Sequence, residues 1–142
     1  MSALERNWGM VDRALEDVDD VILRSQPNGQ SNSIGWLLWH MSRVVDRFVH
    51  TWCQDAPQLW VKDSWHEKFG LDADPDDTGQ GWSKDQVAGW QLPAKPLRNG
   101  ASGDLVKGGA LQGHGCVLPN DKRRHLDAWR RLDWFSGSGF KR

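Results

Sequence analysis

Residues 32–46 read Asn-Ser-Ile-Gly-Trp-Leu-Leu-Trp-His-Met-Ser-Arg-Val-Val-Asp, and the prediction of the fold starts from them. Ser31, Asn32 and Ser33 are N-cap candidates for a helix that we predict over residues 34–52. Apolar residues recur along it at helical spacing and predict its buried face: Ile34, Leu37, Met41, Val44, Val45, Phe48 and Trp52. His40 lies three residues after Leu37 and four before Val44, so we expect it at the edge of that face.

Upstream, residues 2–23 carry a second helical pattern, whose apolar positions are Leu4, Trp8, Val11, Leu15, Val18 and Ile22. A turn at residues 27–29, Pro-Asn-Gly, separates this pattern from the next one. Two amphipathic helices joined by a short turn favour an antiparallel pair. We therefore expect an all-α protein in which Leu15 and Val44 are both buried between the two helices.

Downstream, residues 53–81 read as a loop that is rich in Asp, Pro and Gly. Trp60, Trp65 and Phe69 are spread along it, so we expect the loop to pack against the helices.

A third helix is predicted to begin after Ser83. Ser83 and Gln86 form a capping box, and Trp82 and Val87 occupy the positions of a hydrophobic staple. The helix must end before Pro93.

The composition changes sharply near residue 95. Up to Leu97 the chain has nine Lys/Arg against fifteen Asp/Glu, whereas the last 45 residues have nine against four. Glycine density also doubles, with seven in the first part and eight in the second. We therefore predict a helical core over residues 1–94 and a Gly-rich basic tail over residues 95–142. One short helix is predicted in the tail over residues 121–135, with its apolar face formed by Leu126, Trp129, Leu132 and Phe135.

Length and composition exclude several protein classes. A chain of 142 residues has room for one domain, and no apolar run approaches the roughly 18 residues of a membrane helix. No signal peptide is evident at the N-terminus. Cys53 and Cys116 form no CxxC pair, which excludes a disulfide scaffold and a zinc ribbon. These features indicate a soluble, cytoplasmic protein.

The five histidines are the first place to look for chemistry. His40, His50, His66, His114 and His125 include no pair spaced i,i+4, the spacing that places two imidazoles on one helix face. Only His40 lies on a well-defined helix beside apolar residues. Two interpretations of it stay open: a hydrogen-bonded packing residue or a metal ligand.

Three other clusters carry weaker signals. The acidic residues Asp72, Asp74, Asp76 and Asp77 fail as a calcium loop, because Pro75 interrupts them and Ser83 replaces the closing glutamate. The stretch 113–116, Gly-His-Gly-Cys, pairs an imidazole with a thiol but is too short to predict a site.

The basic residues of the tail helix are Lys122, Arg123, Arg124, Arg130 and Arg131. They fit a solvated face better than a nucleic-acid interface.

Residues 32–46, together with similar stretches at 58–60, 65–71, 74–79 and 83–88, resemble the DinB-like superfamily. That superfamily includes mycothiol-dependent maleylpyruvate isomerase-like proteins and other thiol-dependent transferases. The resemblance covers about residues 3–90. Beyond it the chain resembles a member that is truncated or frame-shifted.

The resemblance implies an antiparallel four-helix bundle, often dimeric, with a divalent metal such as zinc or nickel held inside by histidines. His40 matches the first of these ligands. Two further histidines, spaced i,i+4, come from the family's last long helix, and this sequence has no such pair. His125 followed by Trp129 has the spacing with one ligand missing.

Two functional hypotheses follow. The first is a metal-dependent transferase or isomerase that uses a low-molecular-weight thiol such as mycothiol on a small electrophile. In it His40 is a metal ligand, Arg43 and Asp46 orient the site or form a salt bridge, and Trp36 and Trp39 form the pocket wall or pack. The second is a non-catalytic module that forms a homodimer through its first two helices. The missing histidine pair favours the second hypothesis, and the intact residues 32–46 favour the first.

Overall fold

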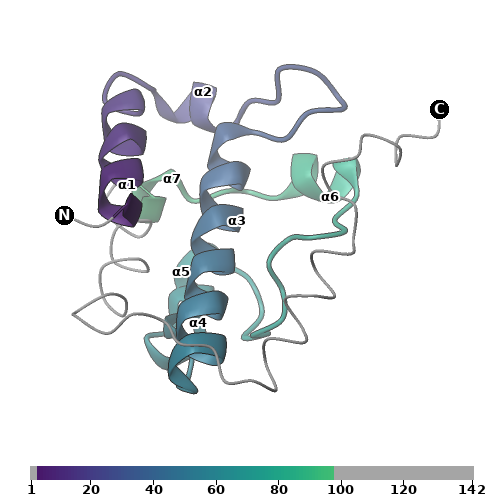
Figure 1. Ribbon diagram of the computed structural model, residues 1–142. Coiled ribbons are helices and arrows are strands. Elements are labelled where there is room, and N and C mark those ends of the chain that lie inside the picture. The colour runs from purple at the N-terminus through teal and green to yellow at the C-terminus, as the bar shows by residue number, and fades with distance from the viewer. Residues whose placement is uncertain (1–2, 98–142) are drawn as a thin grey trace, which may run out of the picture.

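The computed structural model describes residues 3–97, and these are helical with no strand in that range. The predicted all-α class is therefore confirmed. Two helices, α1 (Ala3–Ala14) and α3 (Ile34–Asp46), lie side by side and run in opposite directions (Figure 1). No helix in the described range is long and apolar enough to span a membrane. The tail helix predicted over residues 121–135 lies outside the described residues.

The first predicted helix is interrupted. α1 ends at Ala14, and a separate short helix, α2 (Asp20–Arg24), follows after a turn. The Asp19 side chain accepts a hydrogen bond from the backbone N–H of Ile22 at 2.7 Å and so caps a new helix. The prediction of one continuous helix over residues 2–23 is wrong for this reason. Leu15, expected to be buried, lies past the end of α1 and is half-buried.

The second predicted helix has the expected extent but changes type. The Ser33 side chain accepts a hydrogen bond from the N–H of Trp36 at 3.1 Å and so caps α3. Beyond Asp46 the chain continues as a π-helix, η1 (Arg47–Gln54). It ends at Asp55, which adopts the left-handed conformation with φ of +52°.

The buried face of α3 is not the one that the apolar spacing predicts. Leu37, Met41 and Val44 are 44%, 42% and 45% exposed, so the prediction that Val44 is buried is wrong. Trp36 and Trp39 lie in the core instead. The reason is that α3 is apolar on both sides, and helical spacing alone does not say which side the rest of the chain will cover.

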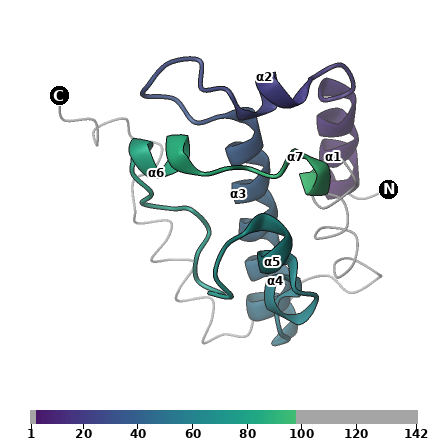
Figure 2. The ribbon, with the colours of Figure 1, turned by 180° about the vertical axis from the view of Figure 1, so that it is seen from behind.

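The downstream chain covers the tryptophan side of α3. It contains four short helices: α4 (Leu59–Lys62), α5 (Trp65–Phe69), α6 (Lys84–Gly89) and α7 (Ala94–Pro96). Figure 2 shows α4, α5 and the connection between α6 and α7 together on one side of α3. Trp39 lies at the centre, with its ring centroid 5.0–6.4 Å from those of Trp36, Trp60, Trp82 and Trp90.

The segment predicted as a loop is therefore partly helical, since α4 and α5 lie within residues 53–81. The expectation that it packs inward is confirmed, because Trp60 and Phe69 are buried and Trp65 is half-buried against the core.

The capping box of α6 is also confirmed. The N–H of Ser83 donates to Gln86 Oε1 at 2.8 Å, and the N–H of Gln86 donates to Ser83 Oγ at 3.2 Å. α6 ends at Gly89, before Pro93, as predicted.

Candidate functional site

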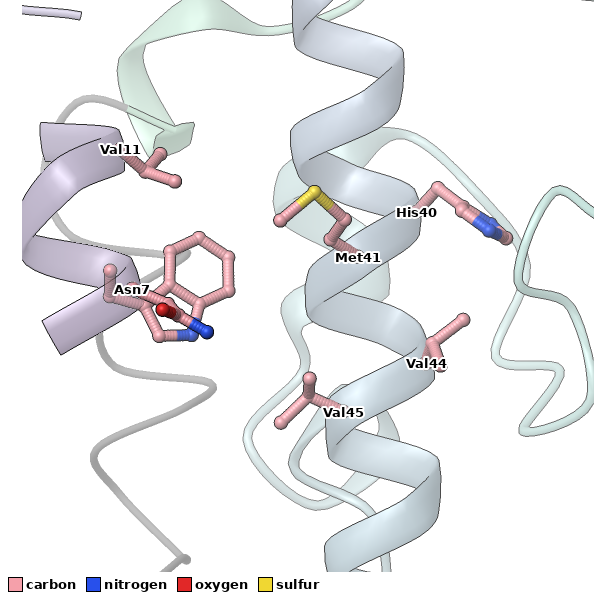
Figure 3. A pocket seen from close by; sticks show the side chains of 7 residues that line it. Asn7, Val11, His40, Met41, Val44 and Val45 are labelled. Atoms are coloured by element: carbon pink, nitrogen blue, oxygen red, sulfur yellow. The ribbon is translucent and has the colours of Figure 1, made fainter. Parts of the chain in front are cut away.

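A groove of about 240 Å³ lies between α1 and α3, and we call it the α1–α3 groove. Its lining is mostly apolar and comprises Asn7, Trp8 and Val11 of α1 with His40, Met41, Val44 and Val45 of α3 (Figure 3). Met41 and Val45 point toward α1, whereas His40 and Val44 lie on the far flank of α3 (Figure 3). The groove therefore extends over the side of α3 that the downstream chain leaves open.

Leu37, Met41 and Val44 form a continuous row on that open side, and we call them the exposed stripe. They are spaced four and three residues apart on one broad face of the helix, with Met41 at the side near α1 and Val44 at the far side (Figure 3). Met41 and Val44 belong to both the stripe and the groove. The groove thus opens directly onto an apolar helix face.

His40 is held by two contacts. Its Nδ1 donates a hydrogen bond to the carbonyl oxygen of Thr78 at 2.6 Å, and its ring stacks on Trp36 with centroids 4.9 Å apart. Because a carbonyl only accepts, Nδ1 carries the hydrogen, and Nε2 is the ring nitrogen that this bond does not use. Metal-ligating histidines are oriented by this kind of bond from their second nitrogen.

The described residues do not otherwise fit a metal centre. Within residues 3–97, no three His, Cys, Asp or Glu side chains gather closely enough to hold a metal ion. A zinc site needs at least three protein ligands, and His40 supplies one. His114 and His125 lie outside the described residues.

Arg43 and Asp46 form a fully buried ion pair at 3.0 Å on the core side of α3. Arg43 also donates to Gln58 Oε1 at 3.0 Å and to the carbonyl of Pro75 at 3.1 Å, and it lies 4.4 Å from the centroid of the Trp60 ring. Burial lowers the pKa of Arg43 from 12.5 to about 10, and the attraction of Asp46 opposes this. The side chain therefore stays charged at neutral pH. Of the two roles expected for this pair, the structure shows the salt bridge.

Asp46 joins three elements through its carboxylate. Oδ1 accepts hydrogen bonds from His50 Nδ1 at 2.8 Å and from the N–H of Leu59 at 3.0 Å. Oδ2 accepts from the N–H of Trp60 at 3.0 Å as well as from Arg43. These bonds connect α3 to η1 and α4 on the side away from the groove, so the role of Asp46 is structural.

His50 makes stability dependent on pH. Its hydrogen bond to Asp46 raises the pKa of this buried histidine above 6.5, against the opposing effect of burial. A raised folded-state pKa stabilises the fold fully below about pH 6.5, and this contribution is lost as the pH rises through the raised value.

We expect the free energy of unfolding to fall between pH 6.5 and pH 9 in the wild type by more than in His50→Gln. Urea unfolding across this range measures it. Parallel profiles for the two proteins would contradict the assignment.

Two tryptophans expected in the pocket wall do not line the groove. Trp36 and Trp39 face the core, and their indole N–H groups have no hydrogen-bond partner within the described part of the chain. The helical spacing of apolar residues did not predict a role for Asn7, which lines the groove from α1. Asn7 directly precedes Trp8, which belongs to the predicted apolar face, and this adjacency was the sequence signal for its place in the groove.

The acidic loop is solvated at Asp72, Asp74 and Asp76, whereas Asp77 is half-buried. Asp74 Oδ1 accepts the N–H of Asp76 at 2.8 Å. Asp77 Oδ1 accepts the N–H of Gly79 at 2.8 Å and Trp82 Nε1 at 3.2 Å. The carboxylates of Asp74 and Asp77 are thus used in turn hydrogen bonds, and that of Asp76 pairs with Arg47 at 2.8 Å.

The chain matches the model of the DinB superfamily over residues 3–98. The match covers the whole described region, including the groove and His40, and extends slightly past the residue 90 at which the resemblance was expected to end. No curated protein matches the chain.

Proposed function

This chain belongs to the DinB superfamily, and from that premise we propose that it is a non-catalytic helical module that binds an apolar helix through the α1–α3 groove. The family resemblance implies a metal held by several histidines. Within residues 3–97 a single histidine, His40, is in position for that role. Binding, rather than metal-dependent catalysis, is the function that this geometry supports best.

The observation that carries the proposal is the exposed stripe. Three large apolar side chains follow one another on one helix face, and each is more than two-fifths exposed in the described part of the chain. Contiguous apolar surface of this kind marks an interaction site in soluble proteins. A row with spacing i, i+4, i+7 beside a groove suits recognition of a second amphipathic helix.

Methionine oxidation tests whether the stripe is covered in solution. Met41 lies on the stripe and is 42% exposed, and Met10 of α1 is a matched control that is 54% exposed and does not line the groove. We expect peroxide to oxidise Met41 several-fold more slowly than Met10 in the full chain, because a bound helix shields it. Val44→Glu should remove this difference. Equal rates in the wild type would contradict the proposal.

A second candidate is a metal-dependent transferase or isomerase that uses a small thiol such as mycothiol on a small electrophile. The specific observation in its favour is the hydrogen bond from His40 Nδ1 to Thr78, which leaves Nε2 able to ligate zinc or nickel. With one ligand among the described residues, no catalytic step through a metal follows from the structure.

Metal analysis separates the two candidates. We expect the purified protein to bind zinc or nickel weakly and substoichiometrically, because His40 alone does not form a tight site. His40→Ala should abolish this binding, whereas His66→Ala, on α5, should leave it unchanged. Elemental analysis and titration calorimetry measure both. One tightly held metal per wild-type chain would overturn the non-catalytic proposal and favour the transferase.

A further inference from the structure

We infer that Arg43 is a positioning residue for His40, the polar side chain at the border of the α1–α3 groove. Arg43 binds the main chain of residues 75–77, and the next residue, Thr78, presents its carbonyl oxygen to His40 Nδ1. This role is additional to the buried salt bridge with Asp46. It goes beyond the proposed function and is independent of the partner that occupies the groove.

The loop that carries Thr78 has no regular secondary structure to fix it. Residues 71–78 are neither helix nor strand, and residues 72–76 are exposed, whereas Thr78 and Gly79 are buried. The hydrogen bond from His40 Nδ1 to the Thr78 oxygen is nevertheless short, at 2.6 Å. Because no helix or strand ladder fixes this carbonyl, side-chain contacts must hold the loop in place.

Arg43 supplies such contacts from the turn of α3 that follows His40. Its Nε donates to the carbonyl oxygen of Asp77 at 3.2 Å, and its Nη2 donates to that of Pro75 at 3.1 Å. Side chains three residues apart lie on neighbouring turns of a helix. α3 therefore binds the carbonyls of residues 77 and 78, which are consecutive, with two side chains one turn apart. This arrangement sets the position of the Thr78 oxygen relative to His40.

The guanidinium of Arg43 is itself held in place. Its Nη1 donates to Asp46 Oδ2 and to Gln58 Oε1, both at 3.0 Å, and its Cζ lies 4.4 Å from the centroid of the Trp60 ring. The side chain is fully buried. A planar guanidinium presents its donors in a fixed fork, so it can bind a carboxylate and two carbonyls together, which the compact ammonium of a lysine does not reproduce. The loop is thus bonded to a fixed point in the core.

Gly79 fixes the loop immediately after Thr78. Its φ of +81° lies in the region that favours glycine, and a Cβ at this position would collide with the ring of Trp39 and press on that of Trp36. The chain therefore approaches the core closely at this point. Thr78 lies between two anchors, the carbonyls bound by Arg43 before it and the close contact of Gly79 after it.

The bond to Thr78 determines which ring nitrogen His40 offers to a partner. A carbonyl only accepts, so Nδ1 carries a hydrogen and Nε2 is the nitrogen that remains. In the neutral ring Nε2 accepts a hydrogen bond, so the group that it suits is a donor such as a hydroxyl or an amide N–H. Through the loop, Arg43 thus sets the polar chemistry at the border of a mostly apolar groove.

Nitrogen NMR of the full chain with ¹⁵N-labelled histidine tests this role. At pH 9 an ordinary imidazole is neutral, and its ¹⁵N shifts report which ring nitrogen carries the hydrogen. The signals that are absent from His40→Gln identify His40. We expect the Nδ1–H form to predominate in the wild type. Arg43→Lys should shift the ratio of the two forms several-fold toward Nε2–H, because lysine keeps a charge opposite Asp46 but lacks the fork that binds the loop.

Arg47→Lys is the matched control. Arg47 follows Arg43 by four residues and pairs with Asp76 of the same loop at 2.8 Å, but through an exposed carboxylate. Its replacement should leave His40 in the Nδ1–H form. A purely structural role for Arg43 would lower stability without changing the ring form of His40 in the folded protein, so this readout separates positioning from stabilisation.

Asp77→Ala loosens the loop while leaving Arg43 in place. It removes the oxygen that accepts the N–H of Gly79 at 2.8 Å and Trp82 Nε1 at 3.2 Å, so we expect the same shift toward Nε2–H. Asp74→Ala removes a similar bond farther from Thr78 and is its control.

The outcomes are assigned as follows. A shift in folded Arg43→Lys with none in Arg47→Lys supports the inference. An unchanged Nδ1–H form in folded Arg43→Lys, an equal shift in Arg47→Lys, or a wild type in the Nε2–H form overturns it. If Arg43→Lys does not fold, Asp77→Ala against Asp74→Ala decides by the same criteria.

Discussion

Asp46→Asn is expected to lower the free energy of unfolding by about 3–5 kcal/mol, because it breaks a fully buried ion pair and leaves Arg43 without its counter-charge. The carboxylate accepts hydrogen bonds from four N–H groups, those of His50, Leu59, Trp60 and Arg43. An amide of the same size has one acceptor oxygen, so some of these donors would face its NH₂ group. Urea unfolding at pH 7 measures the loss.

The control is Asp76→Asn. Asp76 pairs with Arg47 at 2.8 Å, but it is exposed, so its loss should cost about 0–1 kcal/mol. Equal costs for the two substitutions would show that Asp46 does not hold α3, η1 and α4 together.

Trp39→Ala is expected to cost about 3–5 kcal/mol, because it leaves a cavity at the centre of the core. The ring of Trp39 is completely buried and touches those of Trp36, Trp60, Trp82 and Trp90. Its indole N–H has no hydrogen-bond partner within residues 3–97, so the loss is one of packing. The same unfolding experiment measures it.

Val21→Ala is the matched control, because Val21 of α2 is 76% exposed and its truncation should change stability by less than about 0.5 kcal/mol. A small effect of Trp39→Ala would mean that the tryptophan side of α3 is not the core. The predicted buried stripe would then have been the correct face.

The local features of this protein follow from its amino-acid sequence. The caps at Ser33 and Ser83 and the end of α6 before Pro93 were all predictable. They depend on contacts between residues a few positions apart, which sequence spacing records directly. The all-α class follows from the same helical periodicity. The association with the DinB superfamily came from residues 32–46 and the matching stretches after them.

The spacing of apolar residues was less informative where a continuing apolar pattern and a helix cap occur within a few residues of each other. The apolar pattern of residues 2–23 continues past Ala14, yet Asp19 caps a new helix and the chain turns. Four acidic residues among positions 16–20 were the sequence signal for this interruption. The apolar residues Leu15, Val18 and Leu23 still pack against the core, but side-chain capping by Asp19 ends the continuous helix between them.

Which side of α3 is buried depends on the packing of distant segments of the chain. Both sides are apolar: one carries Trp36 and Trp39, and the other carries the exposed stripe. Periodicity fixes which residues share a face but contains no information about which distant segment packs on it. Residues 56–97 cover the tryptophan side, where Asp46 binds the N–H groups of Leu59 and Trp60. These contacts, across 13 and 14 positions of the sequence, leave the exposed stripe on the open side, and His40 lies at the border, where it bonds to Thr78. The candidate site is therefore evident only in the folded chain.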